Sequence, residues 1–414
     1  MDVLRLGIAG LGMAQARVLP EIANLPYVRI CAAADLRQSA LAAFEARFCG
    51  RTFSSVEEMC RYDGIDAVYV ATPHELHASH TITALQNGKH VIVEKPVALN
   101  LSDIQQMNAA AERSNLKLLA GHTHSFDPPI CAMSELVRGG ELGRPLMITS
   151  SYYKDHLFRP FSDHDIRMSR GVVLNQGPHQ VDIVRQIAGG MATSVRATSG
   201  AGEPTRPGEG HYACLLQFEN NLVASLTYSG YGYLDSGELT WWLGEDGKPK
   251  DRQRHPKGRA FFRQLGTGEA RDNALEAALD ERRFGPETKF GPPPRRSRRQ
   301  PFFGLTIVTC EGGDIRQSPH GLYVYDEFGR YEIPLKSGLS AREAELQEFF
   351  TAIREDRPPA HDGRWAQATL EVCLAILESS ATGREVSLCH QVPSRPPLGQ
   401  ATVLSSIPSV LSPT

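Results

Sequence analysis

The feature that most constrains the fold is a pair of glycines that directly follows the first apolar stretch of the chain. Residues 4–9 form a short aliphatic run, and Gly10 and Gly12 come immediately after it, in the segment LGIAGLGMAQA. At such a place the first glycine permits a tight turn, and the second lets the backbone approach a pyrophosphate. Met13 then opens a helix whose free N–H groups and positive dipole end favour phosphate binding. The segment therefore predicts a dinucleotide site, although Gln15 stands where the full motif has a third small residue.

The first 121 residues alternate short β-branched runs with alanine-rich stretches of helical periodicity. This alternation is typical of strand–helix–strand units that feed a parallel sheet, with helices covering both faces. We therefore predict an α/β fold with a doubly wound parallel sheet of the Rossmann type. Its expected strands are residues 4–9, 28–34, 67–71, 90–93 and 117–120, and its expected helices are residues 39–48, 77–86 and 102–113.

An acidic residue at the end of the second predicted strand indicates which dinucleotide is bound. Asp35 lies 25 positions after Gly10, where a carboxylate can accept hydrogen bonds from the ribose hydroxyls of adenosine. Its negative charge disfavours a 2′-phosphate, so we expect NAD rather than NADP as the cofactor. Arg37 follows two residues later and supplies a cation that softens this preference, which leaves NADP open.

Beyond residue 121 the pattern changes to aromatic and β-rich segments that predict antiparallel strands and a second domain. We expect a dinucleotide-binding domain at residues 1–121 and a second domain at residues 122–390. Within the latter, residues 244–300 are rich in Lys, Arg, Gly and Pro, and we expect them to form a partly mobile insertion. Residues 391–414 are expected to form a disordered tail.

A lysine directly follows another apolar strand, in VIVEKP at residues 91–96. The carboxyl ends of parallel strands border the ligand crevice in sheets of this kind, so Lys95 is placed for chemistry. A partly desolvated lysine has a pKa lowered towards neutrality and can take the proton of a substrate hydroxyl while hydride moves to nicotinamide. The alternative is a surface lysine paired with Glu94, and position alone does not decide between the two interpretations.

Composition and charge exclude several other classes of function. Lys and Arg total 44 against 47 Asp and Glu, which gives a net charge of −3 and no general affinity for nucleic acid. No apolar run reaches the roughly 18 residues that a membrane helix needs. Eight cysteines without a C-x-x-C pair argue against a thiolate zinc site and a disulfide scaffold, and they favour a reducing cytoplasm.

Two local patterns have ordinary explanations. His74, His77 and His80 recur at every third position, but no acidic partner with the HExxH spacing accompanies them, so we expect no metal site. The basic run at residues 295–299 lies among prolines and lacks interleaved aromatic residues. We therefore expect a solvated loop there rather than a contact with RNA or an anionic membrane.

Several segments taken together resemble one known family. GLG near the start, ATPHELH at residues 71–77, ALQNGKHVIVEKP at residues 84–96 and GVVLNQGPHQVD at residues 171–182 are similar to the oxidoreductases named for glucose-fructose oxidoreductase, inositol dehydrogenase and MocA (Gfo/Idh/MocA). The similarity extends in order over roughly residues 3–390. It implies a Rossmann domain joined to an α+β domain with an open, mostly antiparallel sheet. The face of that sheet commonly forms the contact of a homo-oligomer, either a dimer or a tetramer.

The resemblance also implies roles for single residues. Lys95 matches the family's catalytic lysine, and His179 matches a histidine beside the substrate. Asn175 stands where the family usually has aspartate, and a neutral amide can hold a substrate hydroxyl or carboxylate without repelling an anion. The residues that match the segment along the nicotinamide half of the cofactor are Thr72, Pro73, His77 and Glu94.

Within that family, the segments GHTHSFDPP, NQGPHQVDIVR and YSGYG most resemble the phthalate 4,5-cis-dihydrodiol dehydrogenases. This similarity implies hydride transfer from a ring cis-diol carbon to nicotinamide, followed by tautomerisation of the hydroxy-ketone to a catechol. A phthalate substrate carries two carboxylates, so we expect cations in its pocket. The candidate substrate contacts are His124, Lys154, His156 and Arg159.

Two alternatives stay open. The first is a dehydrogenase of a sugar, inositol or another polyol, because the fold and Lys95 are shared while the pocket is built from loops. The second is a dinucleotide-binding sensor without turnover, which Lys95 and His179 disfavour because a binder needs no proton carrier.

Overall fold

The computed structural model describes residues 2–189, 191–252, 255–266, 268–290, 299–336 and 338–395. The chain forms two compact units, each assembled from three stretches of sequence. The first comprises Met1–His122, Asp272–Arg295 and Arg342–Leu370, and the second comprises Thr123–Arg271, Arg296–Ala341 and Glu371–Thr414. Most of the predicted basic loop (residues 295–298) and of the predicted tail (residues 396–414) lies outside the described residues.

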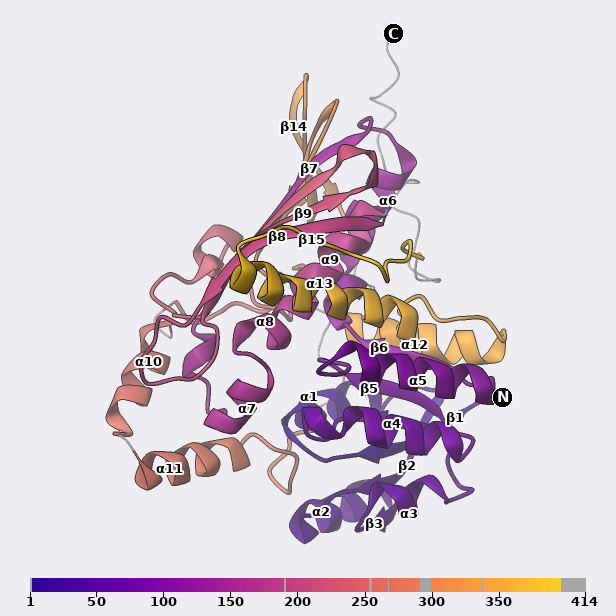
Figure 1. The fold of residues 1–414 in the computed structure, drawn as a ribbon. Helices are drawn as coiled ribbons and strands as arrows, with labels where there is room; N and C mark the ends of the chain where they lie inside the picture. The colour runs from indigo at the N-terminus through magenta and orange to yellow at the C-terminus, as the bar shows by residue number, and fades with distance from the viewer. Residues whose placement is uncertain are drawn as a thin grey trace. The chain divides into compact units, whose positions relative to one another are not determined.

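The first unit is built on a six-stranded sheet. Its strands are β1 (Leu4–Ala9), β2 (Val28–Ala34), β3 (Arg51–Phe53), β4 (Ala67–Val70), β5 (His90–Glu94) and β6 (Leu118–Gly121). They lie in the order β3-β2-β1-β4-β5-β6, and every pairing is parallel (Figure 1). This confirms the predicted Rossmann sheet. The strand order reverses at β1, and the carboxyl ends of the strands at such a point border the ligand crevice of the fold.

The connecting helices follow the predicted pattern closely. They are α1 (Met13–Ile22), α2 (Gln38–Phe48), α3 (Val56–Cys60), α4 (His77–Gln86) and α5 (Leu101–Ser114). In α5, for example, the Asn100 side chain caps the start and Asn115 ends the helix in the left-handed conformation. The sequence did not predict β3 or α3, because elements of three and five residues are too short to show a periodic pattern.

The core of the first unit includes residues from far along the chain. Leu346 and Phe349 of α12 (Ala341–Arg354) and Phe284 are buried in one cluster with the side chains of β1, β2 and α2. The predicted boundary at residue 121 therefore divides residues that share a core. Helical periodicity alone does not indicate which domain a helix packs against. The predicted second domain, residues 122–390, therefore includes α12.

A buried ionic network fastens α12 to this sheet. Arg342 donates to Glu94 at 3.1 Å, to Glu345 at 3.2 Å and to the hydroxyl of Tyr69 at 2.8 Å. Tyr69 itself donates to Glu94 at 2.9 Å. Burial alone would raise the pKa of Glu94, but Arg342 and then Lys95 outweigh burial and hold that pKa below its ordinary value. Glu94 therefore stays ionised at neutral pH.

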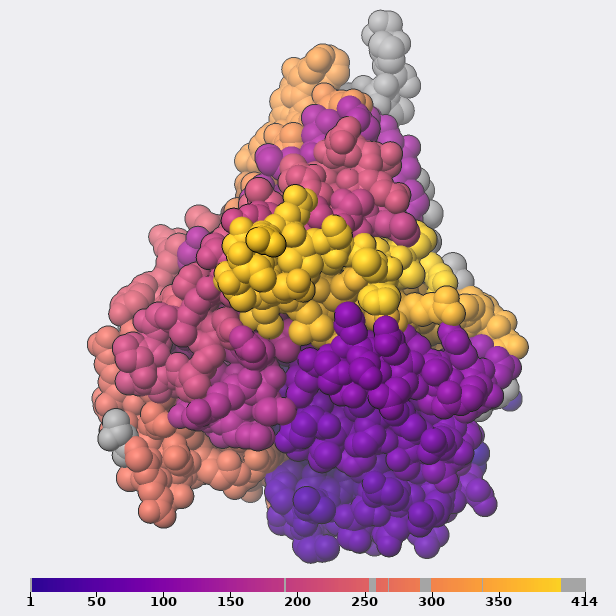
Figure 2. All heavy atoms as spheres, in the orientation of Figure 1, coloured from indigo at the N-terminus to yellow at the C-terminus, as the bar shows by residue number. Residues whose placement is uncertain are grey.

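The second unit is built on a nine-stranded sheet. Its strands are β7 (Pro145–Tyr153), β8 (Ala192–Gly200), β9 (His211–Phe218), β10 (Val223–Ser229), β11 (Leu305–Cys310), β12 (Gly313–Gln317), β13 (Gly321–Asp326), β14 (Gly329–Pro334) and β15 (Val386–Ser387). The order is β14-β13-β12-β11-β7-β10-β9-β8-β15. Only β7 and β10 pair in parallel among these described strands, which confirms the predicted mostly antiparallel sheet. The β13–β14 hairpin forms the orange projection at the top of Figure 2.

Helices pack on one face of the second sheet. They include α6 (Pro128–Gly139), the short α8 (Val172–Asn175) and α9 (Gly177–Ala188). In the chain, α7 (Asp163–Met168) lies between α6 and α8, and the later α13 (Gly363–Thr382) accepts backbone hydrogen bonds of β8 through Ser379 and Ser380. Burial alternates along β9 and β10, so every second side chain lies in the core. The alternate side chains of these strands form the opposite, more open face.

The predicted insertion contains two helices rather than only a loop. They are α10 (His255–Gln264) and α11 (Glu269–Asp280). The sequence EARDNALEAALD of α11 consists largely of good helix formers, but the surrounding Gly, Pro and Arg residues concealed this signal. In α10 the ring of Phe262 packs against Phe158 of the second unit at a centroid distance of 5.6 Å. The segment after α11 instead carries Phe284 into the core of the first unit.

Three further features concern the described part of the chain. None of its helices is both long and apolar enough to cross a membrane. It contains no group of three or more His, Cys, Asp or Glu side chains that could hold a metal ion. All eight cysteines lie within it, and each has a free thiol.

Replacement of Arg342 by methionine should destabilise the protein by about 3 kcal/mol, because Glu94 and Glu345 then lose their cation in a buried setting. The folded-state pKa of Glu94 is depressed from its ordinary 4.5, so the stability from this pair is present above that value and is lost as the pH falls through the folded pKa. The difference in unfolding free energy between wild type and R342M, measured with urea, should therefore shrink as the pH falls from about 7 to about 4. A difference that does not change with pH would contradict the assigned ion pair.

Candidate active site

The turn after β1 has the geometry of a dinucleotide cradle. Gly10 has a φ of +87°, and a Cβ at this position would lie only 2.8 Å from the carbonyl oxygen of Ala71. A Cβ on Gly12 would meet no atom closer than the same carbonyl oxygen, at 3.9 Å, so the space beside Gly12 is open. Met13 begins α1 directly after it and leaves the first N–H groups of the helix available. Gly10 is therefore required by the turn, while Gly12 keeps room for a pyrophosphate, and these residues fit NAD.

Asp35 and Arg37 hold this turn from the end of β2. Asp35 accepts hydrogen bonds from the backbone N–H of Leu11 at 2.7 Å and from that of Arg37 at 2.8 Å. The Arg37 guanidinium donates to the carbonyl oxygen of Leu11 at 2.5 Å and lies 3.3 Å from the Asp35 carboxylate. The charge of Arg37 is thus matched by Asp35, which supports the preference for NAD over a 2′-phosphorylated dinucleotide.

His77 supports the segment after β4. Its Nδ1 lies 2.8 Å from the carbonyl oxygen of Pro96, and its Nε2 lies 2.8 Å from that of Thr72. Burial lowers the pKa of His77, and the two carbonyl acceptors oppose that shift. With both ring nitrogens directed at backbone, the side chain positions Thr72 and Pro73 rather than offering a hydrogen bond of its own. The place of His77 along the nicotinamide half of the cofactor, which the resemblance implies, stays a prediction.

Lys95 lies at the carboxyl end of β5 and is partly buried. Its backbone N–H donates to Glu94 at 3.3 Å. Glu94 is 7% exposed and bound to Tyr69 and Arg342, so it is part of the support of this strand end and not a surface partner of Lys95. The predicted cofactor residue Glu94 therefore acts on Lys95 by fixing the backbone that carries it.

The second unit contains a pair of imidazoles against an aromatic wall. His179 lies in the first turn of α9, and its ring meets that of His124 edge-on at a centroid distance of 4.9 Å. Phe303 packs against both, at 4.7 Å from His124 and 5.2 Å from His179. The Nδ1 of His124 lies 3.0 Å from the carboxylate of Asp127, which leaves Nε2 of that ring as a proton acceptor. Burial raises the pKa of Asp127, and His124 partly opposes the shift.

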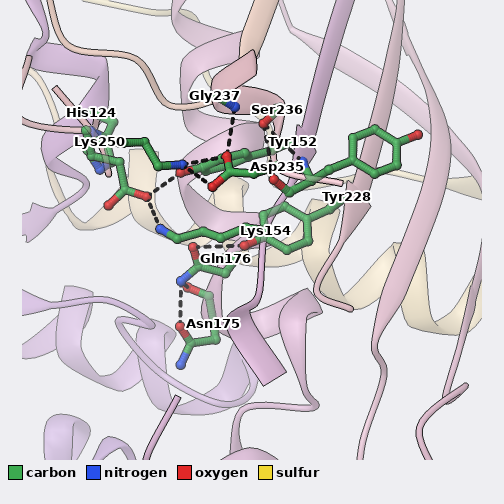
Figure 3. A network of polar contacts seen from close by, with 12 residues as sticks. His124, Tyr152, Lys154, Asn175, Gln176, Tyr228, Asp235, Ser236, Gly237 and Lys250 are labelled. Atoms are coloured by element: carbon green, nitrogen blue, oxygen red, sulfur yellow. Dashed lines mark hydrogen bonds and ion pairs between the residues drawn. The ribbon is translucent and has the colours of Figure 1, made fainter. Parts of the chain in front are cut away.

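A series of polar contacts links Asn175 to two strands of the second sheet (Figure 3). Asn175 is buried at the end of α8 and accepts a hydrogen bond from the side chain of Gln176 at 2.8 Å. Gln176 in turn accepts from the hydroxyl of Tyr228 at 3.4 Å. The ring of Tyr228 meets that of Tyr152 edge-on at 5.5 Å. Asn175 is thus held in place by groups on β7 and β10, as expected of a residue that orients a ligand.

The three predicted cations have different surroundings in the structure. Lys154 forms an ion pair with Glu245, and the same Glu245 oxygen accepts from the hydroxyl of Tyr152 at 2.7 Å (Figure 3). His156 is 3% exposed and packs against Phe161. The guanidinium of Arg159, partly buried just after the 3-10 turn at His156–Phe158, has no hydrogen bond or ion pair with any residue that the structure describes. Arg159 is therefore the cation left to bind an anion.

Sequence patterns did not indicate Tyr152, Phe303 or Glu245. Phe303 comes after the predicted insertion and Glu245 lies at its beginning, so neither belongs to a periodic element that would point it towards a site. Glu245 is held strongly acidic: burial would raise its pKa, but Lys154 and the other positive neighbours hold the pKa well below its ordinary value. The pairing joins residues 91 positions apart, which only the fold brings together.

The segment after α11 supports the dinucleotide turn from behind. The backbone N–H of Phe284 donates to the carbonyl oxygen of Gly12 at 3.3 Å, and its ring is 1% exposed. Phe290 extends this contact, because it packs edge-on against Phe48 of α2 at 5.5 Å and lies under Arg47 at 4.4 Å. Part of the predicted insertion thus fixes the peptide that faces the cofactor.

Comparison with known proteins agrees with this arrangement. The family model for an oxidoreductase family with an NAD-binding Rossmann fold matches residues 4–122, and the model for the GFO/IDH/MocA C-terminal domain matches residues 130–248. The chain belongs to the Gfo/Idh/MocA oxidoreductase family. As a member it is an NAD-dependent oxidoreductase, and the two matched stretches contain all the site residues predicted from the sequence except His124.

Individual Gfo/Idh/MocA relatives are similar over almost the whole chain. A 1-carboxy-3-chloro-3,4-dihydroxycyclohexa-1,5-diene dehydrogenase of Comamonas testosteroni is 36% identical over 386 residues, which cover 91% of this chain and 94% of the relative. A solved structure of a protein from Bordetella bronchiseptica RB50, assigned as a dehydrogenase, has 37% identity and a TM-score of 0.85, and covers 93% of this chain and 100% of its own. An Agrobacterium radiobacter oxidoreductase solved with NAD+, L-tartaric acid and magnesium shares the fold, with 19% identity, a TM-score of 0.67, and coverage of 94% and 98%.

Removal of the Phe284 ring should weaken cofactor binding. We expect F284A to raise the Kd for NAD by about tenfold or more in calorimetric titration, because the buried ring anchors the segment whose backbone N–H at position 284 binds the Gly12 carbonyl oxygen. The matched control is F349A, which removes an equally buried ring from the same core without touching the turn. Both variants should lose comparable thermal stability, but only F284A should lose affinity. Equal losses of affinity in the two variants would show that Phe284 acts through stability alone.

Proposed function

We propose that this oxidoreductase oxidises a cyclic cis-dihydrodiol that carries a carboxylate and so forms a catechol. The observation that supports this most strongly is the Arg159 guanidinium, which has no hydrogen bond or ion pair with any described residue and acts electrostatically on the buried Tyr152 and Tyr228, because a cation beside aromatic rings suits an anionic ring. The name of the Comamonas testosteroni relative, which specifies a carboxylated dihydroxycyclohexadiene, supports the same class of substrate. The cis-4,5-dihydrodiol of phthalate, which the sequence resemblance indicates, is one candidate within this class of substrate.

Each residue has a defined task in this proposal. Lys95 takes the proton from the reacting hydroxyl, and bound NAD supplies the hydride acceptor. The carbinol C–H bond breaks with its electron pair, and the carbonyl C=O bond forms as the O–H proton leaves. Asn175 and His179 bind the diol hydroxyls. The resulting hydroxy-ketone then moves a ring proton to its carbonyl oxygen and becomes aromatic, so no second oxidant is needed.

Loss of the Lys95 amino group should abolish most turnover. We expect K95M to lower kcat by about 10²- to 10⁴-fold, because a positioned proton acceptor contributes a factor of this size. The Kd for NAD should stay near the wild-type value. K95R keeps the positive charge but cannot release a proton near neutral pH, so it should be nearly as impaired as K95M.

The assay follows reduced nicotinamide by its absorbance with NAD and four substrates: the cis-4,5-dihydrodiol of phthalate, the cis-3,4-dihydrodiol of benzoate, myo-inositol and glucose. Turnover of a dihydrodiol alone supports the proposal. Turnover of myo-inositol or glucose alone would replace it with the polyol alternative. Near-normal kcat in K95M with any good substrate would remove Lys95 from the chemistry.

We also propose that the open face of the nine-stranded sheet forms a contact between copies of this chain. Apolar side chains stand exposed there on the two strands that flank β10, Leu215 of β9 at 49% and Met147 of β7 at 42%. An exposed apolar patch on a sheet of this size is typical of a protein interface.

The free cysteine thiols support a reducing cytoplasm as the compartment.

A charge on that face should dissociate the oligomer. We expect the wild type to sediment as a dimer or tetramer and L215K to sediment as a smaller species, because a buried unpaired lysine opposes association. Leu36 lies in the first unit and is 89% exposed, so L36K is the matched control and should leave the mass unchanged. A monomeric wild type would contradict the proposed contact.

A further inference from the structure

We propose that the substrate site of the second unit holds a single carboxylate, bound by Arg159, and that Glu245 sets this number by neutralising Lys154. This inference rests on the proposed function, since it concerns the carboxylate of the same ring substrate. It favours a monocarboxylate dihydrodiol over the dicarboxylate of phthalate. Glu245 would then be a specificity-determining residue that lies outside the sequence motifs.

The positive charge of Lys154 is already neutralised by an acidic side chain of the protein. Its ammonium is paired with Glu245, and the two side chains are 10% and 27% exposed. The Glu245 oxygen that receives Lys154 also accepts from Tyr152, whose ring lies 5.2 Å from the ammonium (Figure 3). A substrate carboxylate would have to displace this Glu245 oxygen to reach Lys154, and would gain little by replacing one carboxylate with another.

The other charged groups of this cluster are also matched. Lys250 binds both carboxylate oxygens of Asp235 at 2.5 Å (Figure 3). His124 is held by Asp127. Arg159 is the remaining cation, and it acts electrostatically on Lys154, Glu245 and Tyr228, so it belongs to the same cluster. Among the described cations of this cluster, Arg159 therefore differs in that its guanidinium has no hydrogen bond or ion pair with a described residue.

In the part of the site that the structure describes, Arg159 is the cation without an ionic partner, and this determines how many carboxylates the site accepts. A carboxylate that leaves water for a site among Tyr152, Tyr228 and Phe303 loses hydration, and it needs an ionic partner to recover the cost. Arg159 can provide that partner with two parallel N–H groups. The second carboxylate of a phthalate ring would find only cations that already have acidic partners. The aromatic rings, in contrast, suit the uncharged edge of a monocarboxylate ring.

The test compares two substrates that differ by one carboxylate, the cis-3,4-dihydrodiol of benzoate and the cis-4,5-dihydrodiol of phthalate, in the NAD-loaded enzyme. The wild type should show a kcat/KM at least about tenfold higher for the benzoate derivative. E245Q keeps the hydrogen bond to Tyr152 but leaves Lys154 without its acid, so this preference should shrink about tenfold or reverse. R159M should raise KM about 30-fold or more for both substrates with a much smaller change in kcat. The assay is run near pH 6.5, because burial and Arg159 already lower the pKa of Lys154 to about 8, and loss of Glu245 lowers it further.

The matched control is D246N, which removes the adjacent acidic charge. Asp246 is exposed and pairs with the exposed Lys248, so D246N should leave both kcat/KM values unchanged. A wild type that prefers the phthalate derivative, or an E245Q variant with the wild-type preference, would overturn the inference. An equal effect of D246N and E245Q would also overturn it, because the general charge of the region would then be responsible.

Binding of benzoate and phthalate themselves separates this inference from the proposed function. In calorimetric titration of the NAD-loaded enzyme, benzoate should bind more tightly than phthalate, and R159M should abolish this binding. If no dihydrodiol is oxidised but benzoate binds through Arg159, the proposed function fails and the single-carboxylate site stands. If dihydrodiols are oxidised but Arg159 and Glu245 do not alter selectivity, the function stands and this inference fails.

Discussion

The guanidinium of Arg342 links helix α12, which comes late in the chain, to the end of strand β5 in the first unit. It comes from a helix late in the chain and binds two buried carboxylates, Glu94 and Glu345, that would otherwise repel each other. Glu94 is the residue before Lys95 and accepts the backbone N–H of that lysine. The strand end that presents the proposed proton acceptor is therefore fixed by a residue 248 positions further along the chain. Without this cation, the buried Glu94 would have to become protonated or seek water.

The elements that depend on local sequence could be predicted. The turn at Gly10 and Gly12 is encoded by a strand, two glycines and a helix start in immediate succession, and the structure has this order. Asp35 was placed correctly because the end of a parallel strand fixes the position of the next residue relative to the turn after β1. The resemblance identified Lys95 and His179 as candidates, and their chemical roles remain proposals.

The remaining site residues could not be predicted, because they depend on contacts between distant segments. Nothing near Glu245 in the sequence indicates that it pairs with Lys154, so the sequence could not rank Lys154 against the other candidate substrate cations. Phe303 packs against both imidazoles although it lies beyond the predicted insertion in the sequence. Likewise, the contact of Phe284 with Gly12 could not be predicted, because the sequence indicates only a partly mobile insertion at residues 244–300 and not that part of it joins the core of the first unit.

The composition of the first unit from three stretches of sequence has a consequence for recombination between relatives. A crossover near residue 122 would combine one parent's sheet with the other parent's Phe284, Leu346 and Phe349, although these side chains share one close-packed core. Cofactor domains can therefore be exchanged intact only when all three stretches come from the same parent.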